Sequence, residues 1–482
     1  MIKYDQKSMK ADEFINDAEI RETIEYANAN KNNTELIDSL LKKARPKKNG
    51  NGVICAGLTH REASVLLACD IPEKIEKMYK LAHEIKLAFY GNRIVMFAPL
   101  YLSNYCVNGC VYCPYHLKNK HIARVKLTQE QVRNEVIALQ DMGHKRLAIE
   151  AGEDPQNNPI DYILECIKTI YSIHHKNGDI RRVNVNIAAT TVENYRKLKN
   201  AGIGTYILFQ ETYNKSSYLK LHPTGPKHDY DYHTEAMDRA MKGGIDDVGL
   251  GVLFGLEGYQ YEFAGLLMHA EHLEAVHGVG PHTISVPRIK HADDIDPNSF
   301  DNSISDELFA KIIACIRIAV PYTGMIISTR ESETVRGKVL DYGISQISGA
   351  SRTSVGGYTE VERSHDSEQF DVSDQRTLDE VVCWLMQMKH IPSFCTACYR
   401  EGRTGDRFMR LCKNGQILNC CHPNALMTLT EYLVDYASEK TKKIGFELID
   451  SELEKIPTEK VRDIARKNIN DIKNSNCRDF RF

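Results

Sequence analysis

Short apolar stretches recur through the middle of the chain, and a longer amphipathic segment follows each of them. These stretches are IVMFAPLY (94–101), RLAIEAG (146–152), RVNVNIAAT (182–190), TYILFQE (205–211), DVGLGVLFG (247–255), HTISVPRI (282–289), GMIISTR (324–330) and QISGASR (346–352). Nearly continuous apolar strands that alternate with helices are typical of a parallel sheet covered by helices. Eight such units predict an α/β fold, a (βα)8 barrel of the TIM type over residues 86–355.

Both flanks of this region show helical periodicity instead. The stretch EFINDAEIRETIEYANAN predicts a helical N-terminal extension over residues 1–85. After a polar linker, TLDEVVCWLMQMKH and PNALMTLTEYLVDYAS predict a small helical C-terminal domain over residues 356–482. The glycines of GLGVLFG lack the spacing of a dinucleotide-binding turn, so the pattern excludes a Rossmann unit.

Composition narrows the function classes. Charged residues make up 26% of the 482 residues and the net charge is -3, which gives no electrostatic case for binding nucleic acid or an anionic membrane. The first residues contain no apolar signal region and no apolar run is long enough to span a bilayer, so we expect a cytoplasmic protein. Fourteen cysteines in such a protein favour thiols that bind metal or act in catalysis.

Polar residues gather at the ends of the predicted strands, where barrel enzymes place their chemistry. They are Asn104, Glu153, Glu211, Arg288, Arg330 and Arg352. Directly after the first strand, SNYCVNGCVYCPY contributes Cys106, Cys110 and Cys113. Such soft thiolates select zinc or iron–sulfur clusters. His116 could complete a structural zinc site, whereas three thiolates on a 4Fe-4S cluster would leave one iron open to a non-protein ligand.

A second set of cysteines lies in the C-terminal domain. Cys395 and Cys398 form C-x2-C, and Cys421 follows after twenty-two residues. Cys412 and Cys420 are rival ligands in the same stretch. The spacing alone also allows a structural zinc site made by Cys395, Cys398, Cys420 and Cys421.

The C-x3-C-x2-C motif at the end of the first strand resembles that of the radical S-adenosylmethionine (SAM) enzymes. The resemblance implies a 4Fe-4S cluster on Cys106, Cys110 and Cys113, with SAM on the open iron. It also implies that Tyr112 lies beside the adenine in the active site.

EAGED places Gly152 and Glu153 like the family's Gly-Gly-Glu element, which holds the methionine amine, although Ala151 replaces its first glycine. Glu211 is a further implied SAM contact. The family's G-x-I-x-G-x-x-E element is only partly kept, because Gly258 stands where the glutamate would be.

A narrower resemblance covers nearly the whole chain. CTACYREGRTGDRFM with C-x2-C-x22-C, RRVNVNIAATTVENY, FQETY, GPKHDYDYH and GPHTISVPR are similar to the radical SAM tyrosine lyases of FeFe-hydrogenase maturation, the HydG family. The resemblance implies cleavage of the Cα–Cβ bond of L-tyrosine to p-cresol and dehydroglycine. Carbon monoxide and cyanide would then form on a second 4Fe-4S cluster, held by Cys395, Cys398 and Cys421, that carries a labile extra iron with a bridging amino acid such as cysteine. The product would be an Fe(CO)(CN) unit for the hydrogenase active site.

The same resemblance implies further residues and partners. Arg330 is the candidate for the tyrosine carboxylate, since a guanidinium pairs with it bidentately, and Arg288 is a weaker rival that could meet SAM instead. The resemblance assigns one histidine to the labile iron; we take His272, with His269 and His282 as alternatives. The implied partners are a reductant protein such as ferredoxin or flavodoxin and other hydrogenase maturases.

Two other functions stay open at this point. The 2-iminoacetate synthase of thiamine biosynthesis shares the tyrosine-cleaving barrel but lacks the C-terminal cysteine motif. A non-catalytic iron–sulfur scaffold that passes clusters to partners is the second alternative, and it would not cleave SAM.

Overall fold

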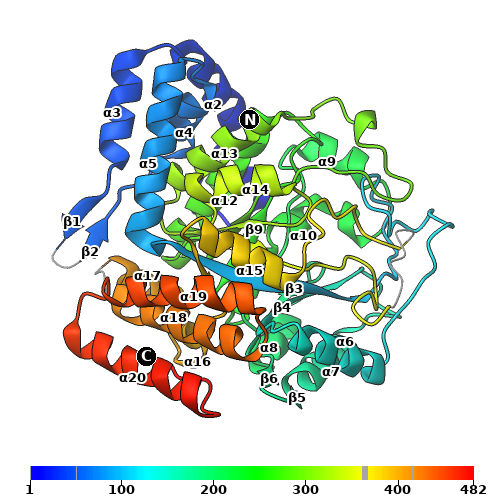
Figure 1. Cartoon of the computed structure of the whole chain (residues 1–482). Coiled ribbons are helices and arrows are strands. Elements are labelled where there is room, and N and C mark those ends of the chain that lie inside the picture. Colours follow the sequence, from blue (N-terminus) through cyan, green and yellow to red (C-terminus); the bar gives the residue numbers. More distant parts are fainter. Residues whose placement is uncertain (1, 50–51, 361–366, 414–416) are drawn as a thin grey trace.

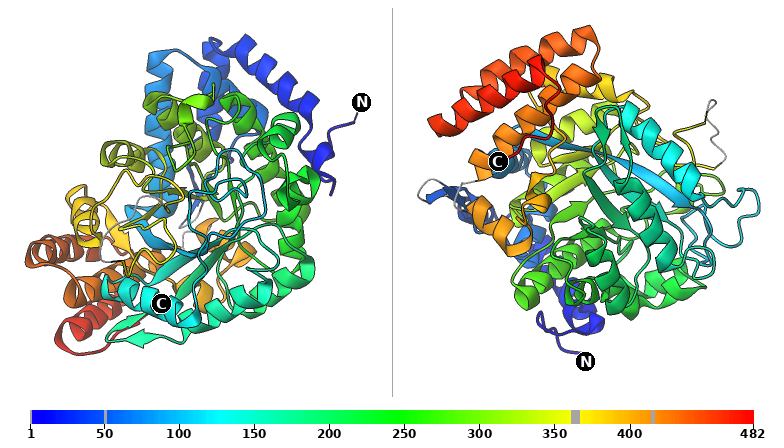
Figure 2. Two further views of the ribbon diagram at one scale, coloured as in Figure 1. Left: turned by 90° about the vertical axis from the view of Figure 1, so that its right-hand side faces the viewer. Right: turned by 90° about the horizontal axis from the view of Figure 1, so that it is seen from below.

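Eight parallel strands close into the barrel that the apolar stretches predict. A computed structural model describes residues 2–49, 52–360, 367–413 and 417–482. The barrel strands are β3 (Arg93–Ser103), β4 (Arg146–Ala151), β7 (Arg182–Asn186), β8 (Tyr206–Ile207), β9 (Val248–Gly251), β10 (Thr283–Ser285), β11 (Gly324–Ile327) and β12 (Gln346–Ser348). Pairing of β12 with β3, for example Ser348 with Phe97, closes the ring. The predicted TIM-type fold class is confirmed (Figures 1 and 2).

Helices surround this ring, which explains why the strands are apolar over nearly their whole length. Around the barrel they are α6 (Gln129–Asp141), α7 (Ile160–Tyr171), α8 (Val192–Asn200), α9 (Lys215–Leu221), α10 (Tyr230–Thr234), α11 (Ala236–Lys242), α12 (Tyr259–His277), α13 (Asp306–Ala319), α14 (Glu333–Tyr342) and α15 (Leu378–Gln387). Side-chain caps fix many of the helix starts: Thr128 and Ser305, for example, each accept a hydrogen bond from a backbone N–H of the first turn.

The N-terminal extension is helical, as its periodicity predicts, apart from one hairpin. Its helices are α1 (Ala11–Phe14), α2 (Asp17–Asn30), α3 (Thr34–Ala44), α4 (His60–Ala68) and α5 (Pro72–Tyr90). Between α3 and α4, β1 (Lys47–Asn49) and β2 (Gly52–Ile54) pair in antiparallel fashion. Helical periodicity could not detect these strands of three residues, because the signal for a short hairpin is its turn residues.

The C-terminal region consists of helices beside the start of β3, with one added strand. The helices are α16 (Ala397–Arg400), α17 (Gly405–Lys413), α18 (Ile417–Asp435), α19 (Glu439–Leu453) and α20 (Glu459–Asn474). Strand β13 (Ile391–Ser393) lies parallel to β3 and pairs with Arg93–Val95. Figure 1 shows α16 to α19 near the beginning of β3. The division of the chain at residues 85 and 355 stays a prediction.

No helix in the described parts of the chain is long and apolar enough to cross a membrane. The cytoplasmic location expected from the sequence stays a prediction.

Phe14 ties the N-terminal extension to the barrel helices. Its ring is fully buried and stacks on His272 of α12, with 3.8 Å between ring centroids. We expect Phe14→Ala to destabilise the fold by about 3–5 kcal/mol, since the substitution leaves a cavity the size of the ring. Thermal unfolding measures the effect, and Tyr26→Ala, at an exposed tyrosine of α2, is the control. Equal melting temperatures for both variants would contradict the assigned packing.

Candidate functional site

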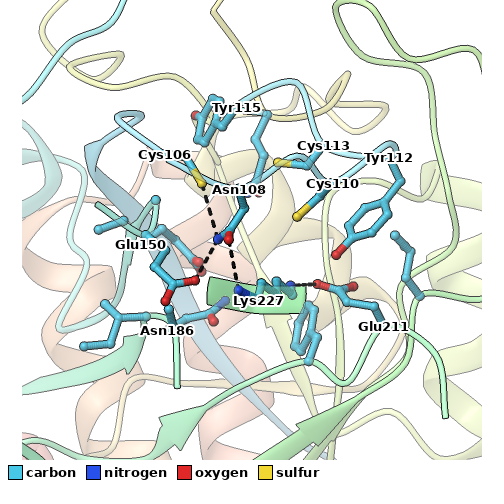
Figure 3. Close-up of a pocket in the computed structure, with 18 of the residues that line it drawn as sticks. Cys106, Asn108, Cys110, Tyr112, Cys113, Tyr115, Glu150, Asn186, Glu211 and Lys227 are labelled. Atoms are coloured by element: carbon cyan, nitrogen blue, oxygen red, sulfur yellow. Dashed lines mark hydrogen bonds and ion pairs between the residues drawn. The ribbon is translucent and has the colours of Figure 1, made fainter. Parts of the chain in front are cut away.

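Three cysteines line a cavity at the carboxyl end of the barrel. Cys106, Cys110 and Cys113 lie in the loop that follows β3, and they border a cavity (Figure 3). Backbone hydrogen bonds hold this loop, because the N–H of Val107 donates to Glu153 and that of Gly109 donates to Thr224. The loop is therefore fastened to the ends of two further barrel units.

Burial disfavours the charged forms of these thiols. It raises the pKa of Cys110 to about 12, and it raises the pKa values of Cys106 and Cys113 as well, while the ammonium of Lys227 acts in the opposite direction. Buried thiolates need a positive charge to balance them. A bound metal supplies that charge and keeps its thiol ligands deprotonated. The donor set and its burial therefore fit an iron–sulfur cluster.

Gly152, at the end of β4, makes the close approach that the loop requires. A Cβ atom on this residue would lie 2.4 Å from the carbonyl oxygen of Tyr105 and 3.0 Å from Cβ of Cys106. Next to it, the Glu153 carboxylate accepts a hydrogen bond of 2.6 Å from Nδ2 of Asn108. The two residues singled out in EAGED thus lie against the cysteine loop, and both line the cavity.

Glu211 enters the same cavity from the end of β8. Its Oε1 accepts from Nζ of Lys227 at 2.9 Å, and its backbone adopts a left-handed φ of 67°. The buried carboxylate of Glu262 on α12 holds this turn, since it accepts hydrogen bonds from the Thr212 hydroxyl and from the N–H of Tyr213 at 2.9 Å. Sequence reasoning missed Lys227, although the stretch GPKHDYDYH that contains it is part of the family resemblance.

Tyr112 lies among the cysteines with its hydroxyl fixed. The hydroxyl is 2.7 Å from Nε2 of His222, and Nδ1 of His222 is 2.7 Å from the carbonyl oxygen of Tyr218. Burial lowers the pKa of His222 to about 2. A neutral His222 therefore donates to Tyr218 and accepts from Tyr112, which sets the orientation of the phenol ring.

Arg330 follows β11 and reaches the interior of the barrel. Its guanidinium lies 3.7 Å from the centre of the Phe370 ring, and burial lowers its pKa. The Glu150 carboxyl group of β4 lines the same cavity, and burial raises its pKa well above the usual value while Arg330 acts against that shift. Sequence reasoning missed Glu150, the first residue of EAGED, because it lies within an apolar strand and outside the part of the motif that resembles Gly-Gly-Glu.

The structure does not place Arg288 in this group. Its guanidinium pairs with the buried Glu331, donates to the carbonyl oxygen of Ile304 at 3.1 Å and lies 2.8 Å from Asp306. Two residues further on, Lys290 lines the cavity instead. The strand-end position was visible in the sequence, but the direction of the side chain was not.

His116 is engaged away from the thiols, which weakens the zinc alternative. Its Nε2 is 3.1 Å from Oδ2 of Asp294. Because the ring pairs with a carboxylate, a tetrahedral zinc site would have to break that contact to recruit it.

A second cavity contains the other three cysteines, at the opposite end of the barrel. Cys395, Cys398 and Cys421 line it together with residues from the amino ends of strands, such as Arg93 of β3 and Arg146 of β4. The sulfur atoms of Cys398 and Cys421 are 3.9 Å apart. This end is formed by β13, α16 and α18, so the C-terminal region brings the thiols to the barrel.

Two buried arginines, Arg93 and Arg146, line the cavity of these thiols, and a third, Arg182, lies against the ring of Tyr399 in its wall. Within the described parts of the chain, Arg93, Arg146 and Arg182 form no ion pair with Asp or Glu, and Nη1 of Arg93 and Nε of Arg146 are buried without a hydrogen-bond partner. Uncompensated buried cations are costly unless an anion neutralises them. A cluster held by three thiolates is anionic overall, so this donor set fits one.

The rival cysteines are placed differently. Cys420 does not line the second cavity, and its sulfur is 3.7 Å from Nη1 of Arg403. The side chain of Cys412 lies outside the described residues. Cys420 therefore does not line the same cavity as the other three thiols, which weakens the alternative of a zinc site that includes it.

His272, the residue preferred from the sequence as the ligand for a labile iron, contacts other parts of the chain than these cysteines. Its Nδ1 is 2.8 Å from the carbonyl oxygen of Gln6, and its Nε2 is 3.1 Å from Asp238. His269, the first alternative, lies one turn before His272 on α12, and its Nδ1 contacts the Tyr213 hydroxyl. His282, the second alternative, lines the cavity with Cys395, Cys398 and Cys421, and burial lowers its pKa. His282 therefore lies in the cavity of these cysteines, whereas α12 presents His272, the residue preferred from the sequence, to the N-terminal extension.

The barrel interior extends from the first cavity toward the second. A cavity lined by Phe97, Ser285, Ile326 and Ser348 shares Glu150 and Arg330 with the first one. Since side chains alternate along a strand, Arg146 and Ala148 point inward with Glu150. The two groups of cysteines thus lie at the two ends of one barrel.

Replacement of Gly152 tests the first cavity. In Gly152→Ala the new methyl group would displace the Tyr105–Cys106 backbone at a cost of about 1–3 kcal/mol, so we expect lower iron and sulfide per chain after anaerobic reconstitution. Gly258→Ala is the matched control, because nothing lies within 4 Å of its added Cβ. Equal iron content in both variants would contradict the assigned role of the close approach.

Comparison with known proteins agrees with this geometry. Residues 100–269 match the Radical SAM superfamily, and residues 285–390 match the Biotin and Thiamin Synthesis associated domain. The 2-iminoacetate synthase of Salmonella typhimurium is 27% identical over 332 residues, which cover 68% of this chain and 85% of that protein.

Two solved structures resemble the chain along nearly its whole length. A crystal structure of HydG, a maturase of the FeFe-hydrogenase, is 54% identical with a TM-score of 0.91 and covers 97% of this chain and 100% of its own. HydG from Carboxydothermus hydrogenoformans is 37% identical with a TM-score of 0.81, covering 95% and 99% of the two chains. This chain therefore belongs to the HydG family of the radical SAM superfamily.

Proposed function

We propose that this protein is a radical SAM lyase that serves FeFe-hydrogenase maturation. It cleaves the Cα–Cβ bond of L-tyrosine to p-cresol and dehydroglycine, and then forms carbon monoxide and cyanide for an Fe(CO)(CN) unit. One observation carries the proposal: three cysteines line a cavity at each end of a single barrel. Membership of the HydG family supports it, and the maturase role printed for the two related structures agrees with it.

The first cavity has the residues for cluster and cofactor. Cys106, Cys110 and Cys113 would hold a 4Fe-4S cluster, which together with SAM supplies a hydrogen-abstracting radical when bound. Gly152 and Glu153 would meet the methionine amine of SAM, while Glu211 and Tyr112 would contact the rest of the cofactor. The Glu262 carboxylate and His222 fix the positions of Glu211 and Tyr112, so these two contacts are preorganised.

The middle of the barrel suits a small zwitterionic substrate. Arg330 would pair with the tyrosine carboxylate, and the nearby carboxyl group of Glu150 is available to the amine. Apolar and hydroxyl side chains such as Phe97 and Ser285 line the interior beyond them. Enclosure by the barrel excludes water from a reactive imine such as dehydroglycine.

The second cavity would receive dehydroglycine. Cys395, Cys398 and Cys421 would hold a second 4Fe-4S cluster, and His282 would bind the labile iron that shares a bridging amino acid, such as cysteine, with this cluster. The buried arginines at this end balance the negative charge of the cluster and its ligands. A ferredoxin or flavodoxin would supply electrons, and other maturases would receive the product.

A narrower activity is the alternative, namely a 2-iminoacetate synthase that stops at dehydroglycine. The similarity to the Salmonella typhimurium enzyme favours it. Anaerobic incubation with SAM, dithionite and L-tyrosine, assayed for p-cresol and carbon monoxide together, separates the two. Both products are expected; p-cresol alone would favour the alternative, and neither product would refute both activities.

The double variant Cys395→Ser/Cys398→Ser tests the division of labour between the two ends. We expect p-cresol formation to persist while capture of carbon monoxide on iron disappears, since only the second cavity loses its thiolates. Cys420→Ser is the matched control because its thiol does not line the cavity. Undiminished carbon monoxide on iron in the double variant would remove the role given to these cysteines.

Arg330→Ala tests substrate binding. A charge-assisted hydrogen bond to a carboxylate contributes about 1.5–3 kcal/mol, so kcat/KM for tyrosine should fall by roughly 10- to 150-fold while SAM binding is retained. Arg352→Ala, at the end of the neighbouring strand but outside the cavity lining, serves as control. An unchanged kcat/KM in Arg330→Ala would show that another residue holds the carboxylate.

A further inference from the structure

Each ring nitrogen of His282 faces a polar side chain from a different part of the chain. Its Nε2 is 2.5 Å from the Tyr399 hydroxyl of α16, and its Nδ1 is 3.4 Å from Oδ1 of Asp247. Asp247 and His282 directly precede β9 and β10, and the pairing of Gly249 with Thr283 in these strands brings them together. The tertiary fold therefore builds the row Asp247–His282–Tyr399 across the amino end of the barrel.

The Asp247 carboxylate can still accept a hydrogen bond from the histidine. Its Oδ1 accepts from the backbone N–H of Gly405 at 3.0 Å, which ties the C-terminal region to the barrel. Its Oδ2 and Nδ1 of His282 are both buried, and neither has a hydrogen-bond partner among the described residues. A buried carboxylate that faces an imidazole favours the proton on the nearer nitrogen, which leaves the lone pair on Nε2.

Tyr399 stands where that lone pair points. Its hydroxyl lies on Nε2 of His282, and the face of its ring contacts the Arg182 guanidinium. Tyr399 lines the cavity with the three cysteines and also a separate cavity that contains Lys199, Asp246 and Asp247. The Tyr399 side chain thus separates the cavity of the thiols from this separate cavity, which we call the outer cavity.

We propose that Asp247 and Tyr399 are positioning residues for the labile iron. Asp247 keeps His282 in the tautomer whose Nε2 can bind iron, and Tyr399 covers Nε2 until iron displaces its hydroxyl and the ring moves aside. Iron reaches the site through the outer cavity. The inference rests on the proposed function, in that it takes His282 as the iron ligand, but nothing in it depends on tyrosine cleavage.

Iron binding to the reconstituted protein tests both roles. The protein is loaded with its clusters, stripped of labile iron with a chelator, and titrated anaerobically with Fe²⁺, with the affinity and the binding rate followed by visible and EPR spectra. Asp247→Asn keeps an oxygen for Gly405, but its amide would donate to Nδ1 and force the proton onto Nε2. We expect its Kd for Fe²⁺ to rise about 10- to 100-fold, with partial recovery in Asp247→Glu.

Tyr399→Phe removes the competing hydroxyl, so Fe²⁺ should bind several-fold faster and at least as tightly. Asp246→Asn is the matched control, because Asp246 lines the same outer cavity but pairs with Lys199 and Thr404. Formation of p-cresol, measured in the wild type and in Asp246→Asn, shows whether the first cavity is active in each preparation. Absence of p-cresol in the wild type would refute the proposed function while leaving the iron titration interpretable.

Unchanged iron affinity in Asp247→Asn, or unchanged binding rate in Tyr399→Phe, would overturn the proposal. If a variant fails to retain the second cluster, the His282 tautomer decides instead. Histidine labelled with ¹⁵N in the full-length apoprotein, assigned with His282→Gln, should carry its proton on Nδ1 in the wild type and on Nε2 in Asp247→Asn. The same tautomer in both proteins would likewise overturn it.

Discussion

The pairing of β12 with β3 is the contact on which the rest of this structure depends. It turns an open parallel sheet into a ring, and a ring of parallel strands has an interior with two chemically different ends. Loops after the strands can bring long functional segments to the carboxyl end. The amino end is available to another part of the chain, and β13 with the C-terminal helices occupies it. An open sheet would not place the two groups of cysteines at opposite ends of one barrel.

The two ends of that interior differ in how their buried charges are balanced. At the carboxyl end, Lys227 pairs with Glu211, so cation and carboxylate offset one another. At the amino end, Arg93, Arg146 and Arg182 have no carboxylate partners in the described parts of the chain, although all three are buried. Proteins keep such groups when a ligand completes the balance, which agrees with an anionic cluster there.

Much of the site could be predicted because its residues are close in sequence. Cys106, Cys110 and Cys113 lie in one loop, and the glycine and glutamate of EAGED end one strand. Residues whose role depends on where the side chain points were missed or misplaced. Arg288 looks like a strand-end functional residue but turns toward Glu331, and Lys227 sits in a loop whose composition gives no sign of its contact with Glu211.

The sequence by itself determined the fold class and both cysteine sets, because hydrophobic periodicity and ligand spacing are local properties. Only the tertiary structure decided which of the candidate histidines lies in the cavity of the second set. His269, His272 and His282 are equivalent as residue types, but α12 turns the first two toward the N-terminal extension, whereas the start of β10 places the third in the cavity that Cys398 and Cys421 line. Strand pairing across the closed barrel sets that placement, and contacts between residues far apart in the chain leave no local pattern in the sequence.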